Sequence, residues 1–174
     1  LDPTRPLADL AFDSAAVASA DAGADSGLRR ATALLAAELA GVGRGAIDLA
    51  VEYAKVREQF GQAIGRFQGV AHQLADAWTA VEESWSLALY AAWAVAAEAA
   101  DVDQAVHAAK AKAGEAAIHA AERCTQAHGG IGITWEADPH LYLRRALATD
   151  GWLGTAREHR RRLGALIVES RSLG

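Results

Sequence analysis

The chain has little of several residue types, and each scarcity excludes a class of protein. It has a single cysteine, Cys124, so an internal disulfide is impossible, and a buried, inert thiol in a reducing, cytoplasmic setting fits best. No apolar run reaches the roughly 18 residues that a membrane-spanning helix needs, so we expect no membrane partner. Methionine is absent and the chain begins with Leu1, which indicates a piece of a longer protein or a trimmed one.

The chain also has fewer basic than acidic residues, 17 against 22. The formal net charge is −5 at pH 7, which argues against nucleic acid as the main partner. A local basic run near the C-terminus lacks interleaved aromatic residues, and we interpret it as a solvated helix face. The six histidines are scattered and show no paired metal-ligand spacing, so no metal site is expected.

The 174 residues are enough for one domain with its own core, and 52% of them are hydrophobic. The first part differs from the rest, because Pro3 and Pro6 break helices and residues 7–12 read as a single extended strand. One strand cannot stand alone. We therefore predict that residues 1–26 are the tail of a preceding β domain or a linker, and that residues 27–174 form a helical domain.

Helical periodicity begins at about Leu28. Apolar residues then recur with a 4-3-4-3 spacing, which predicts one long helix that Ser26 caps and that ends near Phe60 and Gly61. Further helices are expected over residues 67–98, with Trp85 facing inward, and then over 101–128, from about 138, and from 153 or 155 to 170. The pattern predicts an all-α fold: an up-and-down four-helix-type bundle with an additional short helix, preceded by a short extended N-terminal segment.

Two loops carry the residues of chemical interest. Residues 57–68 read REQFGQAIGRFQ, with fixed glycines and flanking aromatics. A guanidinium such as that of Arg57 binds two oxygens of a pyrophosphate at once, and a ring such as that of Phe60 packs against adenine. Residues 126–132 read QAHGGIG, where Gly129 and Gly130 allow backbone N–H groups to approach a ligand.

With these loops, residues 28–172 resemble the C-terminal helical domain of acyl-CoA dehydrogenases. The resemblance implies that both loops bind FAD, mostly the FAD held by a neighbouring subunit. The residues it assigns to the pyrophosphate and adenine side are Arg57, Gln59 and Phe60, with Phe67 and Gln68 beside them. Those that approach the adenosine end across a dimer interface are Gln126, Gly129 and Gly130. Thr155 matches a family threonine near the FAD, but Arg157 stands where a glutamine is usual.

The resemblance also implies that the family's catalytic glutamate is missing from this chain. The family removes the α-proton of an acyl-CoA thioester with a glutamate, and a hydride passes from the β-carbon to the flavin. Leu153 occupies that glutamate position, and Ala31 occupies the position that carries the base in some members, so neither side chain can take a proton. Glu38 and Asp150 remain as candidate replacement bases, although a solvated or structural role fits each of them better.

Three hypotheses stay open. The chain supplies the flavin-binding and oligomerisation domain of an FAD-dependent acyl-CoA dehydrogenase, or it is a non-catalytic partner subunit that completes the FAD site of a glutamate-bearing homologue. The third is a plain helical bundle whose loops are only caps. For the first two, the resemblance implies an acyl-CoA substrate, a subunit of the same or a homologous kind as partner, and an electron-transfer flavoprotein as electron acceptor.

Overall fold

The computed structural model describes residues 2–9, 11–13 and 23–172. Its main elements are five helices, with bounds α1 (Ala24–Val56), α2 (Gln68–Ala96), α3 (Val102–His128), α4 (Pro139–Asp150) and α5 (Ala156–Ser172). Between them lie two short strands, β1 (Glu58–Gln59) and β2 (Gln62–Ala63), and two 3₁₀ helices, η1 (Ile64–Arg66) and η2 (Gly129–Ile133). No helix among the described residues is long and apolar enough to cross a membrane.

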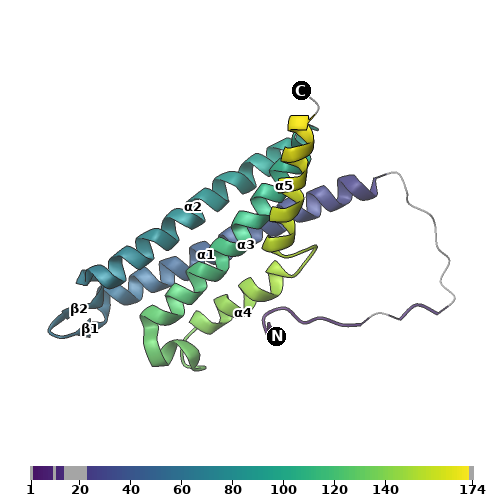
Figure 1. Ribbon diagram of the computed structural model, residues 1–174. Helices are drawn as coiled ribbons and strands as arrows, with labels where there is room; N and C mark the ends of the chain where they lie inside the picture. Colours follow the sequence, from purple (N-terminus) through teal and green to yellow (C-terminus); the bar gives the residue numbers. More distant parts are fainter. Residues whose placement is uncertain (1, 10, 14–22, 173–174) are drawn as a thin grey trace.

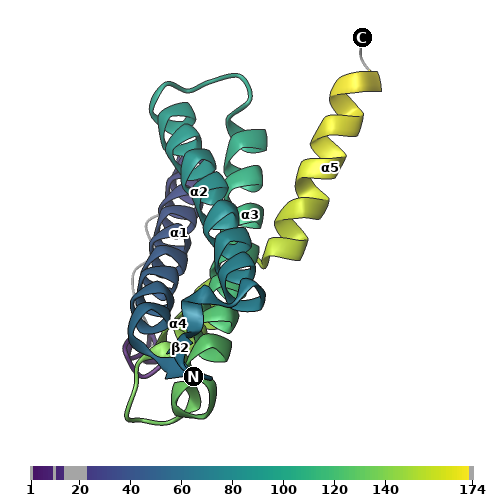
Figure 2. The same ribbon diagram turned by 90° about the vertical axis from the view of Figure 1, so that its left-hand side faces the viewer.

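The three long helices form an up-and-down bundle (Figure 1). The chain reverses direction between α1 and α2 and again between α2 and α3, so α1 and α3 end at the same end of the molecule. Helix α3 is central, because it contacts α1, α2, α4 and α5. Helix α5 leans away from the other helices toward its C-terminus (Figure 2). The all-α prediction is confirmed.

Small residues bring the three long helices close together. Most of the buried apolar residues are alanines. A Cβ added to Gly43 on α1 would lie 2.9 Å from Cγ2 of Val81 on α2 and 3.3 Å from Cα of Ala117 on α3. At this level α1 therefore lies against the backbone of α3 and against the Val81 side chain of α2, and the core has little room for larger side chains.

The first predicted helix ends four residues early, at Val56. Residues 58–63 turn back as an antiparallel hairpin in which Glu58 pairs with Ala63 and Gln59 pairs with Gln62. The two residues of the turn, Phe60 and Gly61, have φ angles of 53° and 80°, as expected for a tight two-residue hairpin turn. The hairpin keeps Phe60 at its tip instead of on a helix.

Two other predictions are wrong for the described residues. Ser26 is not a helix cap, because α1 already begins at Ala24. Trp85 does not face inward: it is 43% exposed on α2. The strand expected over residues 7–12 stays a prediction: residues 7–9 and 11–12 pair with no strand among the described residues, and Leu10 lies outside them. The division at residue 26 into a β-domain tail and a bundle stays a prediction.

Two glycines of α1 should respond in opposite ways to alanine. At Gly41 an added Cβ meets no atom within 4 Å, so Gly41→Ala should raise the free energy of unfolding by about 0.5–1 kcal/mol through helix propensity alone. Gly43→Ala should lower it by roughly 1 kcal/mol or more, because the methyl group overpacks the three-helix contact. Urea unfolding followed by circular dichroism measures both. Equal stabilisation by the two variants would contradict the close approach.

Candidate functional site

The two sequence loops meet at one end of the bundle. They line a cavity of about 320 Å³, here called the hairpin pocket. Four of the residues assigned to FAD by resemblance are among its lining: Gln59, Phe60, Phe67 and Gln126. They come from the β1–β2 hairpin, the start of α2 and the last turn of α3, so residues about 60 positions apart in the sequence face one space.

The aromatic part of this pocket is held out into solvent. Phe60 is 95% exposed at the hairpin tip, and its ring meets the ring of Phe67 edge to face, with 6.2 Å between centroids. An exposed phenyl ring with one ring neighbour is a ready surface for stacking a planar ligand. Arg123 on α3, which the sequence analysis did not single out, also lines the pocket.

The remaining assigned residues divide into two groups. Arg57, Gln68, Gly129 and Gly130 are exposed at the same end of the bundle, but they are not among the lining residues of the hairpin pocket. Thr155 lies elsewhere, in the connection from α4 to α5, and α4 alone spans roughly 18 Å.

Thr155 has a clear structural role. Its N–H and its hydroxyl donate to Oε2 of Glu158 at 2.7 Å and 3.0 Å, and Glu158 N lies 3.4 Å from Thr155 Oγ1. This reciprocal arrangement is a capping box at the start of α5. The threonine-x-x-glutamate spacing was visible in the sequence, so this role could have been read from it.

A second cavity, of about 510 Å³, contains both positions where the resemblance expects a base. Ala31 of α1 and Leu153 of the α4–α5 connection line it together, and the other lining residues are Leu34, Leu35, Glu38 and Trp152. We call it the Leu153 pocket. Leu153 has a φ of 57°, a left-handed conformation that is unusual for leucine and that tends to persist at functional sites. The pocket is therefore apolar at both base positions.

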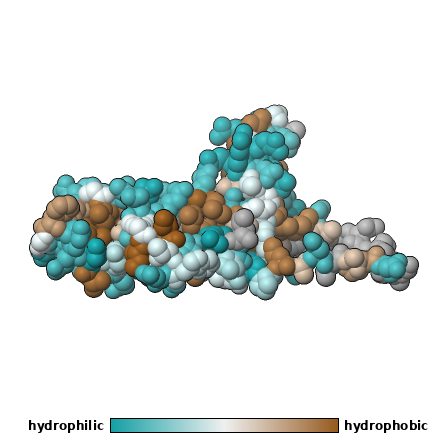
Figure 3. Space-filling view, turned by 90° about the horizontal axis from the view of Figure 1, so that it is seen from below, coloured by the Kyte–Doolittle hydropathy of each residue, from teal (hydrophilic) through white to brown (hydrophobic). Residues whose placement is uncertain are grey.

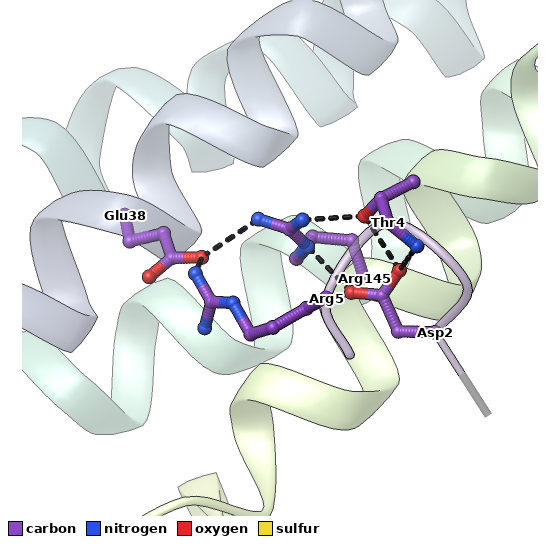
Figure 4. A network of polar contacts seen from close by, with 5 residues as sticks. All are labelled: Asp2, Thr4, Arg5, Glu38 and Arg145. Carbon is purple, nitrogen blue, oxygen red and sulfur yellow. Dashed lines mark hydrogen bonds and ion pairs between the residues drawn. The ribbon is translucent and has the colours of Figure 1, made fainter. Parts of the chain in front are cut away.

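Glu38, the carboxylate of the Leu153 pocket, forms ion pairs with two arginines. Figure 4 shows its Oε1 between the guanidinium groups of Arg5 and Arg145, and the Arg145 contact is 3.2 Å. Arg145 Nε also donates to Asp2 at 2.5 Å, and Arg145 makes a further hydrogen bond to Thr4. Glu38 thus ties the N-terminal segment to α1 and α4, which weakens its candidacy as a base.

Asp150 also has structural partners. Its Oδ1 accepts the N–H of Ala156 at 3.0 Å and lies 3.6 Å from Nζ of Lys110. Lys110 is fully buried, and its ammonium donates to the carbonyl oxygens of Asp150 and Gly154 at 2.9 Å and 3.0 Å. Burial lowers the pKa of Lys110, and Asp150 partly offsets this effect. The pair therefore fixes the two ends of the connection that carries Leu153.

A pair of histidines supports the same connection from α3 and α5. His159 Nε2 donates to the carbonyl oxygen of Leu153 at 3.1 Å, because a carbonyl can only accept. With His159 neutral, its Nδ1 must accept, so His107 Nδ1 donates to it at 2.9 Å. Burial lowers the pKa of His159 to about 4, and burial and the charge of Arg162 lower the pKa of His107. Both rings are hence neutral at pH 7.

Neither thiol nor metal chemistry has support in the described part of the chain. Cys124 is buried, and burial raises the pKa of its thiol to about 12, so the reactive thiolate is scarce at neutral pH. Among residues 2–9, 11–13 and 23–172, no three histidine, cysteine or carboxylate side chains cluster as metal ligands. The titratable groups near Leu153 are thus structural supports.

The stability of the protein should depend on pH through His159. The unfolded chain takes up a proton on this histidine near pH 6.5, whereas the folded protein does so only near pH 4. The contribution of His159 to the free energy of unfolding should therefore fall by roughly 2–3 kcal/mol from pH 6.5 to pH 4, and level off above about pH 7.5.

His159→Gln should flatten that dependence, measured by urea unfolding across the pH range. His72→Gln is the matched control, because His72 is exposed on α2. If wild type and His159→Gln lost stability equally between pH 6.5 and pH 4, the buried neutral histidine would be ruled out.

Several known proteins are similar to this chain. A family model described as acyl-CoA dehydrogenase, C-terminal domain, matches residues 23–167. The acyl-CoA dehydrogenase IpdE2 of Mycobacterium tuberculosis is 42% identical over 173 residues, which are 98% of this chain and 51% of that protein. The acyl-CoA dehydrogenase FadE34 of the same organism is 42% identical over 166 residues, 95% of this chain and 23% of that protein.

A solved structure extends the comparison to an assembly. The ChsE4–ChsE5 complex from Mycobacterium tuberculosis matches with a TM-score of 0.77 at 33% identity, over 82% of this chain and 38% of the matched chain. The chain spans about half the length, or less, of the relatives that it matches.

Proposed function

The chain belongs to the acyl-CoA dehydrogenase family of flavoproteins, whose C-terminal domain it carries, and from this premise we propose that it supplies part of the FAD site and of the subunit interface of an acyl-CoA dehydrogenase. The observation that carries the proposal is the hairpin pocket. Four residues assigned to FAD from two distant loops line one cavity, and two of them are an aromatic pair formed by the exposed Phe60 and the half-buried Phe67. FAD, when bound, supplies the hydride acceptor.

The residues present suit the adenine and diphosphate end of FAD. Phe60 and Phe67 offer ring surface, Gln59 and Gln126 offer amide donors and acceptors, and Arg57 adds a cation at the entrance to the hairpin. By the family resemblance, the FAD concerned is mostly held by a neighbouring subunit. The substrate proposed on the same ground is an acyl-CoA thioester, with an electron-transfer flavoprotein as the electron acceptor.

Exposed apolar side chains support assembly with another subunit. On α2, Trp78, Trp85, Leu89 and Trp93 are 38–56% exposed, and their spacing places them on one side of the helix. Figure 3 shows apolar patches among polar side chains on the face of the molecule seen from below. Large exposed aromatic residues are typical of surfaces that another protein covers.

Replacing Arg57 tests the cofactor assignment. Arg57→Ala should lower flavin retention about tenfold or more, since it removes charge-assisted hydrogen bonds to phosphate oxygens, while the exposed position leaves the helices folded. The flavin-to-protein ratio after gel filtration and the circular dichroism spectrum measure the two effects. Arg171→Ala, at an exposed arginine of α5, is the matched control. Unchanged flavin content in Arg57→Ala would remove the assignment.

A second candidate function is favoured by the Leu153 pocket. Ala31 and Leu153 occupy both base positions, and the carboxylate that lines the pocket with them, Glu38, is bound by two arginines. A chain of this kind can complete the FAD site of a homologous subunit that carries the glutamate, without removing a proton itself. The matched ChsE4–ChsE5 structure is a complex, which supports this form of assembly.

Installing a carboxylate distinguishes the two candidates. If the chain lacks a base of its own, the full-length protein purified alone should not exchange the α-protons of an acyl-CoA in deuterated water, and Leu153→Glu should gain this exchange. Mass spectrometry of the recovered acyl-CoA measures it. Leu153→Gln, with the same size and no basic group, should stay inactive. Exchange by the wild-type protein alone would show that a base is present and would contradict the partner role.

A further inference from the structure

Arg123 has an unusual position in the hairpin pocket. It lies on α3, one turn before Gln126, and among the described residues that line the pocket it is the one with a charge. Its Nη1 donates to Oε1 of Gln73 on α2 at 3.1 Å, which holds the guanidinium across the gap between α2 and α3. Arg57 is not among the lining residues. The positive charge of the pocket therefore comes from Arg123.

One donor of this guanidinium lacks an acceptor. Arg123 Nε is buried and has no hydrogen-bond partner among the described residues. A buried donor without an acceptor destabilises a folded protein, so such groups are rare and call for an explanation. Two other buried polar atoms also lack partners, His140 Nδ1 and Thr149 Oγ1, but neither residue lines the hairpin pocket. Arg123 differs from these two residues because it lines a pocket that has space for a ligand.

The surrounding side chains define the ligand chemistry. A guanidinium that lines a pocket and is held by a hydrogen bond to a neighbouring side chain suits phosphate oxygens better than neutral groups. The rings of Phe60 and Phe67 stand at the same pocket and suit a planar base. An anionic group joined to a flat aromatic base, as in a nucleoside diphosphate, satisfies both features at once.

We propose that Arg123 is a cofactor-binding residue that donates to the diphosphate of an adenine nucleotide seated in the hairpin pocket. Gln73 acts as its positioning residue. This inference rests on the proposed FAD site but assigns the charge that recognises the diphosphate to α3, a place that neither sequence loop predicts. In this arrangement Arg123 donates to the phosphate oxygens from α3, in addition to the exposed Arg57 at the start of the hairpin.

The test compares three ligands of the purified protein after removal of its flavin: FAD, ADP and adenosine. Arg123→Met keeps most of the side-chain stem and removes the charge, and Arg123→Lys keeps the charge without the planar fork. Arg30→Met is the matched control, because Arg30 is exposed on α1. Isothermal titration calorimetry gives each affinity, and thermal unfolding checks that each variant is folded.

Arg123→Met should weaken binding of FAD and of ADP about tenfold or more and leave adenosine unchanged, since only the first two carry phosphate. Arg123→Lys should fall between it and the wild type, and Arg30→Met should match the wild type. Wild-type affinity of Arg123→Met for FAD and ADP would overturn the proposal. An equal loss for adenosine would also overturn it, because Arg123 would then act through packing.

Two further results separate this inference from the function on which it rests. If Arg57→Ala or Phe60→Ala weakens FAD binding and Arg123→Met does not, the FAD site stands and the role of Arg123 is wrong. If the wild-type protein binds neither FAD nor ADP, the proposed FAD site fails and this inference fails with it. If Arg123→Met does not fold, the affinities of Arg123→Lys test the proposal instead. Unchanged affinity of Arg123→Lys for FAD and ADP would then overturn the proposal.

Discussion

The close, alanine-lined contact of α3 with α1 and α2 is the constraint on which the candidate site depends. Because the three helices alternate in direction, α1 and α3 finish at the same end of the bundle. The hairpin that follows α1 is thereby placed beside the last turn of α3, and the hairpin pocket forms between them. Gly43 marks how tight this contact is, since a methyl group there would lie only 2.9 Å from Cγ2 of Val81 on α2 and 3.3 Å from Cα of Ala117 on α3. The fold thus brings the site together without a long loop.

Buried polar groups hold the other important segment, the α4–α5 connection. Lys110 and His159 donate to the backbone carbonyls of Asp150, Leu153 and Gly154, and each of these hydrogen bonds satisfies a group that would otherwise be buried unpaired. Glu38 and Arg145 hold the N-terminal segment against the same region. Glu38 and Asp150 are therefore held in structural contacts, and the Leu153 pocket presents hydrocarbon at the two positions where the family resemblance expects a base.

The sequence alone predicted the parts of the fold that depend on local pattern. Apolar periodicity, together with cap residues, proline and glycine, located all five helices to within a few residues, and the glycines of residues 57–68 and 126–132 marked the two loops. Prediction from the sequence failed where contacts between helices determine which side chains are buried or cap a helix. Trp85 follows the apolar spacing of α2 but faces outward, and Ser26 has the chemistry of a cap but lies inside α1.

The same limit applies to the site. Gln59, Phe60, Phe67 and Gln126 were identifiable because they belong to motifs, and the structure brings them into one pocket. Arg123 belongs to no recognisable motif, and only its packing against Gln73 shows where it points. The engagement of Glu38 by arginines at positions 5 and 145 likewise depends on contacts between distant parts of the chain.

The most direct test of the account is a visible absorbance spectrum of the longest natural form of the protein, purified without any homologous subunit. The spectrum is recorded before and after anaerobic addition of mixed acyl-CoAs. The account predicts that any flavin band stays unchanged, because Ala31 and Leu153 provide no base, and that bleaching appears once a glutamate-bearing homologue is added. A flavin band that bleaches with this protein alone would contradict the absence of a base.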